Sequence, residues 1–143
     1  MTTFTGRCHC GNIEIAFETA REAGALAVRA CDCSFCRLHG MRATSDPEGR
    51  VTITIHDPER ANLYRFALKT ADFLICGECG VYVAAVMNDG GATWATLNVN
   101  TLDDAAAFSQ AAAVVSYDGE SAEARRARRR ESWTPATLLA QPA

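Results

Sequence analysis

The sequence has no long apolar run, no internal repeat and no low-complexity stretch. Its longest apolar run, from Val81 to Met87, is seven residues long, whereas a helix that spans a bilayer needs about 18. The first residues lack the basic start and apolar stretch of a secretory signal, so we expect a cytoplasmic protein without a membrane partner. Positive charge is not in excess either. The 14 cationic and 17 acidic residues give a net charge of −3, which excludes a chain whose overall charge attracts polyanions.

Cysteine, in contrast, is abundant, with 7 residues in a chain of 143. A domain of this length can bury a core without metals or disulfides. Its content of 48% apolar and 22% charged residues is that of an ordinary globular protein. The cysteines therefore need a chemical reason. In a reducing cytoplasm, clustered thiols are more often metal ligands or catalytic groups than disulfides.

Short segments of alternating polarity predict a mainly β fold. Apolar residues recur at every second position over 13–17 and 51–55, which is typical of half-buried strands. Turn residues separate these segments from further strand candidates at Ala25–Arg29, Leu63–Leu68, Phe73–Ile75, Val81–Met87, Thr93–Val99 and Ala113–Tyr117. Many short strands at this spacing favour a sandwich or folded-over sheets.

Two segments near the C-terminus interrupt the β pattern. The alanine-rich segment Asp103–Phe108 predicts a helical turn, and Ser121–Trp133 predicts a helix with Ser121 as its N-cap. We therefore expect a zinc-binding domain over residues 1–120, followed by a basic helix and a dispensable tail over 121–143. Five arginines between Arg125 and Arg130 could bind nucleic acid or an acidic partner. We instead interpret them as a solvated face whose cations suit a helix C-terminus, and nucleic-acid binding is not expected.

The cysteines form three clusters: Cys8-His9-Cys10, Cys31-Asp32-Cys33-Ser34-Phe35-Cys36 and Cys76-Gly77-Glu78-Cys79-Gly80. Thiolates one or two residues apart can turn two sulfurs toward one tetrahedral zinc ion. The glycines of the third cluster suit a tight turn whose backbone amides point at the sulfurs and offset their charge. A redox pair of the thioredoxin kind is the alternative, but that motif opens a helix, whereas Cys79 leads directly into apolar strand residues. We therefore predict metal ligation.

The seven cysteines divide as two, two and three. Two pairs complete one closed four-cysteine site of the structural kind. The triplet Cys31, Cys33 and Cys36 leaves a tetrahedral ion one open position, which is typical of a catalytic zinc. His39 or Asp32 could close that position, and the triplet could also remain as metal-free thiols. Spacing alone does not tell which clusters share an ion.

Several segments resemble, in order, the family of glutathione-dependent formaldehyde-activating enzymes and centromere protein V. Residues 6–13 resemble its opening G-x-C-x-C-G-x-[VI] motif, and residues 31–37 resemble its C-x-C-S-x-C-R segment. Residues 73–80 are similar to its F-x-x-C-x-x-C-G turn, and residues 98–103 to its N-[VL]-x-x-L-D motif. The resemblance covers roughly residues 4–103 and accounts for all 7 cysteines.

The resemblance implies an Mss4-like fold, in which zinc pins folded β-sheets together as a tent or sandwich. It also implies a closed structural ion on Cys8, Cys10, Cys76 and Cys79, and a second ion on the triplet. The activity of the family is addition of glutathione to formaldehyde, classed with the carbon–sulfur lyases. His39 departs from the family pattern, which has a small residue there.

The expected chemistry is that of a zinc-dependent carbon–sulfur lyase. Zinc held by three thiolates suits a fourth sulfur better than ionisation of water, and a thiol such as glutathione loses its proton on coordination. We expect Cys31, Cys33, Cys36 and Arg37 to form the catalytic site. Arg37, and after it Arg42, is the candidate partner of substrate carboxylates, although either could be a solvated surface charge.

Three aromatic residues and one histidine complete the candidates. Trp94, Tyr82 and Phe35 could line a pocket, but aromatic residues in strands more often belong to the core. His9 is expected to be exposed. The alternative function is a non-catalytic, zinc-stabilised module that binds a protein or nucleic acid. The triplet favours the enzyme, because a binding module needs only the closed site.

Overall fold

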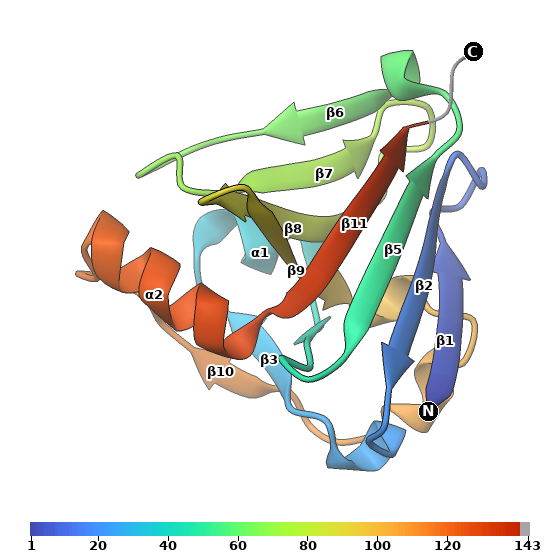
Figure 1. Cartoon of the computed structure of the whole chain (residues 1–143), viewed down its shortest axis with the longest axis horizontal. Coiled ribbons are helices and arrows are strands. Elements are labelled where there is room, and N and C mark those ends of the chain that lie inside the picture. The colour runs from blue at the N-terminus through green and yellow to red at the C-terminus, as the bar shows by residue number, and fades with distance from the viewer. Residues whose placement is uncertain (141–143) are drawn as a thin grey trace.

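Within residues 1–140, eleven strands form one mixed sheet that branches and folds over on itself (Figure 1). The computed structural model describes residues 1–140. In chain order the strands are β1 (Thr2–Arg7), β2 (Ile13–Thr19), β3 (Val28–Cys31), β4 (Ala43–Thr44), β5 (Arg50–Ile55), β6 (Ala61–Tyr64), β7 (Asp72–Cys76), β8 (Tyr82–Asp89), β9 (Ala92–Asn98), β10 (Ala113–Val115) and β11 (Thr134–Ala140). The α-helices are α1 (Ser34–His39) and α2 (Ala122–Ser132), and short 3₁₀ helices span Ala23–Ala25, Pro58–Arg60, Val99–Thr101 and Ala105–Ala107.

Strand β9 is the junction of the sheet. One edge of β9 pairs with β8, which continues to β7 and β6. The other edge pairs with β11 at its start and with β4 at its end. From β11 the sheet continues through β5 and β2 to β1, and from β4 it continues through β3 to β10. In Figure 1 the β6–β7–β8 arm lies across the top, and β11, β5, β2 and β1 descend beside one another.

The predicted mainly β fold is confirmed. The alternating segments 13–17 and 51–55 form β2 and β5, and the strand candidates Phe73–Ile75, Val81–Met87 and Thr93–Val99 form β7, β8 and β9. The predicted helical turn is the 3₁₀ helix Ala105–Ala107. The prediction over Leu63–Leu68 holds only as far as Tyr64, because the chain then turns through Ala67 and Lys69 at positive φ. Strand β1 was not expected, because it is a mostly exposed edge strand without alternating apolar residues. Helix α1 has only six residues and gave no periodic signal.

The chain after the second helix corrects a prediction. Helix α2 begins as expected, with the Ser121 hydroxyl accepting a hydrogen bond from the amide of Ala124 at 3.1 Å. The residues beyond it were predicted to be a dispensable tail, yet Thr134–Ala140 is an inner strand that pairs with both β5 and β9. Pro135, which cannot donate a backbone hydrogen bond, made a central strand improbable from sequence. Residue 120 is therefore not a boundary of the sheet.

The core lies between the folded arms of the sheet. Phe17, Ile53, Leu97 and Phe108 are fully buried there, and burial of such side chains contributes about 1.5–3 kcal/mol each. Helix α2 has 11 residues, of which most are charged. Within residues 1–140, no helix has the length and apolar character to cross a membrane.

Candidate functional site

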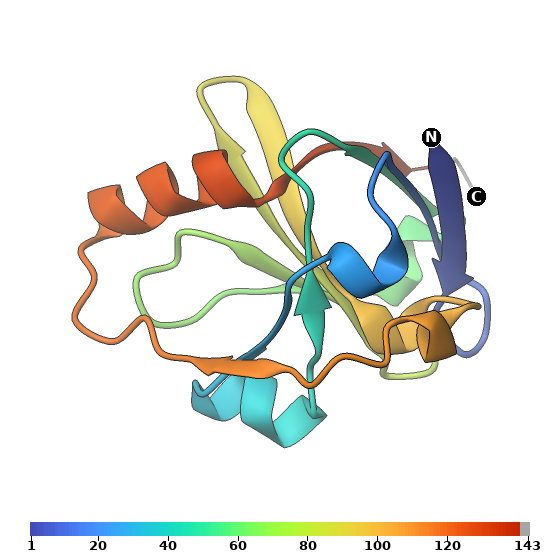
Figure 2. The ribbon, with the colours of Figure 1, turned by 90° about the horizontal axis from the view of Figure 1, so that it is seen from below.

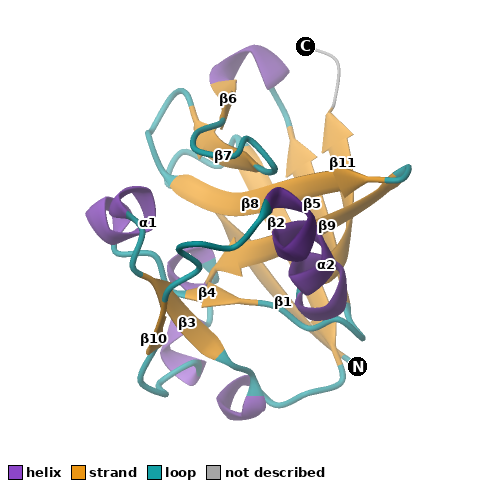
Figure 3. Ribbon diagram, turned by 90° about the vertical axis from the view of Figure 1, so that its left-hand side faces the viewer, coloured by secondary structure: helices purple, strands orange, loops and turns teal. Residues whose placement is uncertain are grey.

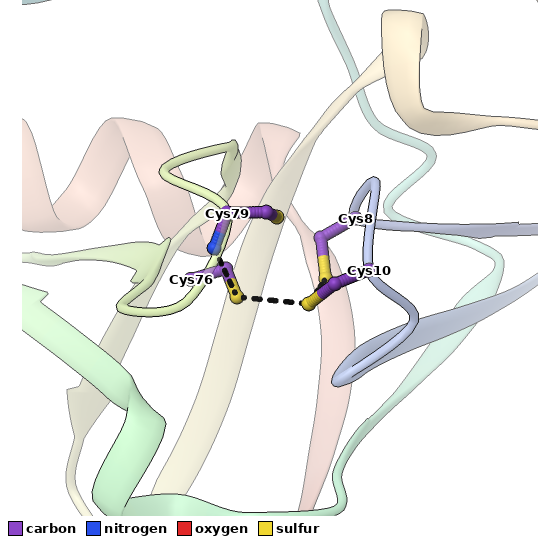
Figure 4. Close-up of side chains that lie close together, drawn as sticks. All are labelled: Cys8, Cys10, Cys76 and Cys79. Atoms are coloured by element: carbon purple, nitrogen blue, oxygen red, sulfur yellow. Dashed lines mark hydrogen bonds between the residues drawn. The ribbon is translucent and has the colours of Figure 1, made fainter.

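The first cysteine group joins two arms of the sheet. Cys8 and Cys10, in the turn after β1, face Cys76, at the end of β7, and Cys79, in the turn that follows it (Figure 4). All four sulfurs lie within 4.8 Å of one another. The Sγ atoms of Cys10 and Cys76 are 3.5 Å apart, and those of Cys8 and Cys10 are 3.7 Å apart. Four sulfurs around a tetrahedral zinc ion at about 2.3 Å would be separated by about 3.8 Å, so this donor set fits zinc.

Backbone amides support the sulfurs, as expected for tight turns. The amide of Ile13 donates to the Cys8 sulfur at 3.3 Å, and the amide of Cys79 donates to the Cys76 sulfur at 3.4 Å. Gly80 takes the positive φ of +81° that closes the second turn. Burial raises the pKa of the Cys8 thiol, so a cation is needed to hold it as thiolate. An ion bound here would link turns that are 66 residues apart in the chain, which is the role of a closed structural site.

The second cysteine group lies where β3 passes into α1. Cys31 ends β3, Cys33 is the N-cap of α1, and Cys36 lies within α1. The Cys33 sulfur accepts a hydrogen bond from the Cys36 amide at 3.4 Å, and the three sulfurs lie within 4.8 Å of one another. A hydrogen bond from Cys36 lowers the pKa of Cys31 to about 6. The end of β3 and the first turn of α1 thus bring three sulfurs close together.

The described residues offer this group no fourth histidine, cysteine or carboxylate ligand. Within residues 1–140, neither Asp32 nor His39 belongs to the set of ligand atoms that converge with the three sulfurs. The His39 ring packs instead on Phe35, with centroids 4.6 Å apart, and on Tyr82 at 5.4 Å. The arrangement therefore favours an open position over closure by His39.

The triplet lines a cavity of about 200 Å³. Figures 2 and 3 show α2 on one side of this region and α1 with β3 and β10 on the other. The loop between β6 and β7 contributes Phe66, Ala67 and Leu68 to the wall. Ala67 has a φ of 53°, and backbone strain of this kind is often found at functional sites. The triplet therefore faces a partly open cavity that a small molecule can enter.

Tyr82 is the main aromatic residue of the cavity. It is 2% exposed and packs in one cluster with Cys36 and Met41. Burial, and after it the charges of the three cysteines, raise the pKa of Tyr82 well above its usual range. Of the other predicted aromatic residues, Phe35 packs against Tyr82 at 5.0 Å, and Trp94 packs with Trp133 in a separate cluster.

The arginines predicted to meet a substrate lie elsewhere. Arg37 is exposed and is not among the residues that line the cavity. The guanidinium of Arg42 donates to the carbonyl oxygens of Phe108 and Gln110 at 2.6 and 3.2 Å, which is a structural role. A catalytic role for Arg37 stays a prediction.

The cavity contains four other arginines, namely Arg29, Arg125, Arg128 and Arg129. Three of them come from α2, which sequence analysis assigned to a solvated face. Their spacing of three and four residues puts them on one side of a helix. This spacing is the sequence signal that could have indicated a shared arginine surface. Because α2 returns over the triplet from about 90 residues later in the chain, sequence proximity could not reveal it.

Comparisons with known proteins give two similarities. The model of the family described as "Glutathione-dependent formaldehyde-activating enzyme" matches residues 3–117. A solved structure of a Rhodobacter sphaeroides protein is 33% identical to this chain, with a TM-score of 0.51, and the match covers 69% of this chain and 87% of that one. No curated protein sequence matches. The family match includes all seven cysteines and ends before α2.

Proposed function

The chain belongs to the glutathione-dependent formaldehyde-activating enzyme family, and from this membership we propose that it joins glutathione to formaldehyde in the cavity of the cysteine triplet. The observation that carries the proposal is the triplet itself. Its three sulfurs converge, line a cavity, and have no fourth histidine, cysteine or carboxylate ligand among residues 1–140. Such an activity is that of a carbon–sulfur lyase, and we place it in the cytoplasm, where thiols stay reduced.

The reaction needs one new bond and one proton transfer. The glutathione sulfur attacks the formaldehyde carbon, a C–S bond forms, and the carbonyl π electrons move to oxygen. The proton lost by the thiol is balanced by the proton that the new hydroxyl gains. Cys31, Cys33 and Cys36 would hold a zinc ion, which when bound supplies a site where a thiol loses its proton. Cys8, Cys10, Cys76 and Cys79 would hold a second, structural ion.

The walls of the cavity contribute the remaining chemistry. Tyr82 is buried beside Cys36, and its protonated hydroxyl can donate a hydrogen bond to the oxygen that gains charge during the attack. Donors fixed in a site that excludes water are effective because they need no reorganisation. The apolar loop residues Phe66 and Leu68 line the same space and limit the entry of water.

Replacing Tyr82 by phenylalanine tests this donor. We expect Tyr82→Phe to lower kcat by about 100-fold, as loss of one such donor does, while zinc content and KM stay near the wild-type values. Steady-state kinetics and metal analysis measure both. Tyr64→Phe is the matched control, because Tyr64 is 48% exposed and does not line the cavity. An unchanged kcat in Tyr82→Phe would remove Tyr82 from the mechanism.

The alternative of a binding module receives less support. A module that docked through the basic segment would present its arginines outward. Arg125, Arg128 and Arg129 instead line the cavity, and Arg130 pairs with Asp89. Such a module would also have no use for a cavity at the triplet.

Exchange spectroscopy by NMR tests the proposed reaction directly. Glutathione and formaldehyde exchange with S-hydroxymethylglutathione without a catalyst, and zinc-loaded protein should accelerate this exchange at least 100-fold over the uncatalysed rate. Cys33→Ser should return the rate to that of the uncatalysed reaction. An exchange rate that the wild-type protein leaves unchanged would refute the proposed activity.

A further inference from the structure

We propose that the triplet cavity contains a carboxylate-binding subsite built around Arg129, so that its preferred substrates are thiols that carry a carboxylate. This inference rests on the proposed function, because it concerns the substrate of the same cavity. It does not follow from family membership, because α2, which carries Arg129, lies beyond the residues that the family model matches.

Arg129 is a buried cation without a carboxylate partner. Its side chain lines the cavity, and the residue is 6% exposed. The guanidinium donates to the Thr70 hydroxyl at 2.8 Å and stacks on the Trp133 ring at 4.8 Å. Its Nε has no hydrogen-bond partner, and no carboxylate of residues 1–140 forms an ion pair with it. Buried charges in proteins are normally paired, so this group is suited to an anion that enters the cavity.

The neighbouring arginines are already engaged. Arg125 and Arg128 share the carboxylate of Glu120, and Arg128 lies over the Tyr117 ring at 3.5 Å. Burial, and after it the positive charges of Arg128 and Arg125, lower the pKa of Arg129 to about 10. Arg129 still carries its charge at neutral pH, and the negative charge of a bound carboxylate would stabilise it. Among the α2 arginines of the cavity, Arg129 therefore has free capacity for an anion.

The size of the cavity limits what it can hold. Pockets for drug-sized ligands measure about 300–1,000 Å³, whereas this cavity measures about 200 Å³. It accommodates a thiol and one carboxylate on a short chain, and the remainder of a tripeptide such as glutathione would extend through the opening. The subsite thus recognises the carboxylate of the thiol substrate and not the remainder of the molecule.

A pair of small thiols of equal chain length, one ending in a carboxylate and the other in a hydroxyl, tests the inference. In isothermal titration calorimetry with zinc-loaded protein, 3-mercaptopropionate should bind at least tenfold more tightly than 3-mercapto-1-propanol. Arg129→Gln should abolish this preference by weakening the acid and leaving the alcohol unchanged, and Arg129→Lys should retain part of it. Arg126→Gln is the matched control, because Arg126 belongs to the same helix but does not line the cavity. It should behave as the wild type.

The outcomes separate this inference from the proposed function. Equal affinity of the wild type for both thiols, or a preference that survives in Arg129→Gln, would overturn the carboxylate subsite and leave the thiol site intact. Binding of neither thiol would instead refute the proposed function. A second measurement uses only the wild-type protein: propionate, which has no thiol, should change the tryptophan fluorescence, to which Trp133 beside Arg129 contributes, whereas 1-propanol should not. The absence of a propionate response would also overturn the subsite, even if Arg129→Gln fails to fold.

Discussion

Ending the chain after Glu120 is expected to abolish folding, although every cysteine is retained. The truncation removes α2 and β11, and β11 fills the space between β5 and β9. Residues Ala136–Ala140 pair with Val51–Ile55, and the Thr134 hydroxyl, which is fully buried, accepts a hydrogen bond from the Asp46 amide at 2.8 Å. A typical domain has a free energy of unfolding of only about 5–15 kcal/mol. We expect the loss of an inner strand and its buried contacts to cost more free energy than that.

Circular dichroism and limited proteolysis measure this effect. The truncated chain should lack a cooperative thermal transition and should be digested rapidly, even with excess zinc. Full-length Arg126→Gln, which changes α2 but leaves β11 in place, should melt as the wild type does. A truncated chain with native β signal and a cooperative transition would contradict the inner position of β11 and would restore the expectation of a dispensable tail.

Cys76→Ser should destabilise the protein far more than Cys33→Ser. Cys76 is 1% exposed and joins the group that links the turn after β1 to the turn after β7. Zinc bound at such a site contributes its binding free energy to folding, so we expect the melting temperature to fall by more than about 10 °C, since a loss of 1 kcal/mol lowers it by about 2–4 °C in a domain of this size. Cys33 belongs to a local group within six residues, and its loss should lower the melting temperature by less than about 4 °C.

Differential scanning calorimetry and metal analysis distinguish these effects. Each variant should lose one zinc ion per chain, but only Cys76→Ser should lose much stability, and only Cys33→Ser should lose activity while it remains folded. Similar losses of stability in the two variants would contradict the assignment of one structural and one functional group.

The strands that could be predicted from sequence are those that bury one face. Strands β2 and β5 alternate because their inward residues, such as Ile15 and Ile53, pack in the core, and that pattern is visible in the sequence. Strand β11 gave no such signal, because Pro135 and two threonines interrupt its apolar residues. Its position depends on long-range pairing with β5 and β9, which local patterns do not encode.

The same distinction applies to the site. The three cysteine clusters could be located from spacing, since chelation requires ligands that are close in sequence or brought together by tight turns. The pairing of Cys8 and Cys10 with Cys76 and Cys79 was implied only by family resemblance. Proximity to Cys36 in the sequence predicts a substrate contact for Arg37, whereas the cavity takes its arginines mainly from α2. Which distant helix covers the triplet is a property of the folded chain.

The central claim is that the triplet keeps one position open for a thiol, and glutathione binding to the cobalt-substituted protein tests it most directly. A thiolate that enters the open position should change the absorption in the sulfur-to-cobalt charge-transfer region at millimolar glutathione. His39→Ala should respond as the wild type does, because the His39 ring packs on Phe35 and Tyr82 and not against the sulfurs. A wild-type protein that ignores glutathione, together with a His39→Ala variant that responds, would show that His39 closes the site and would contradict the claim.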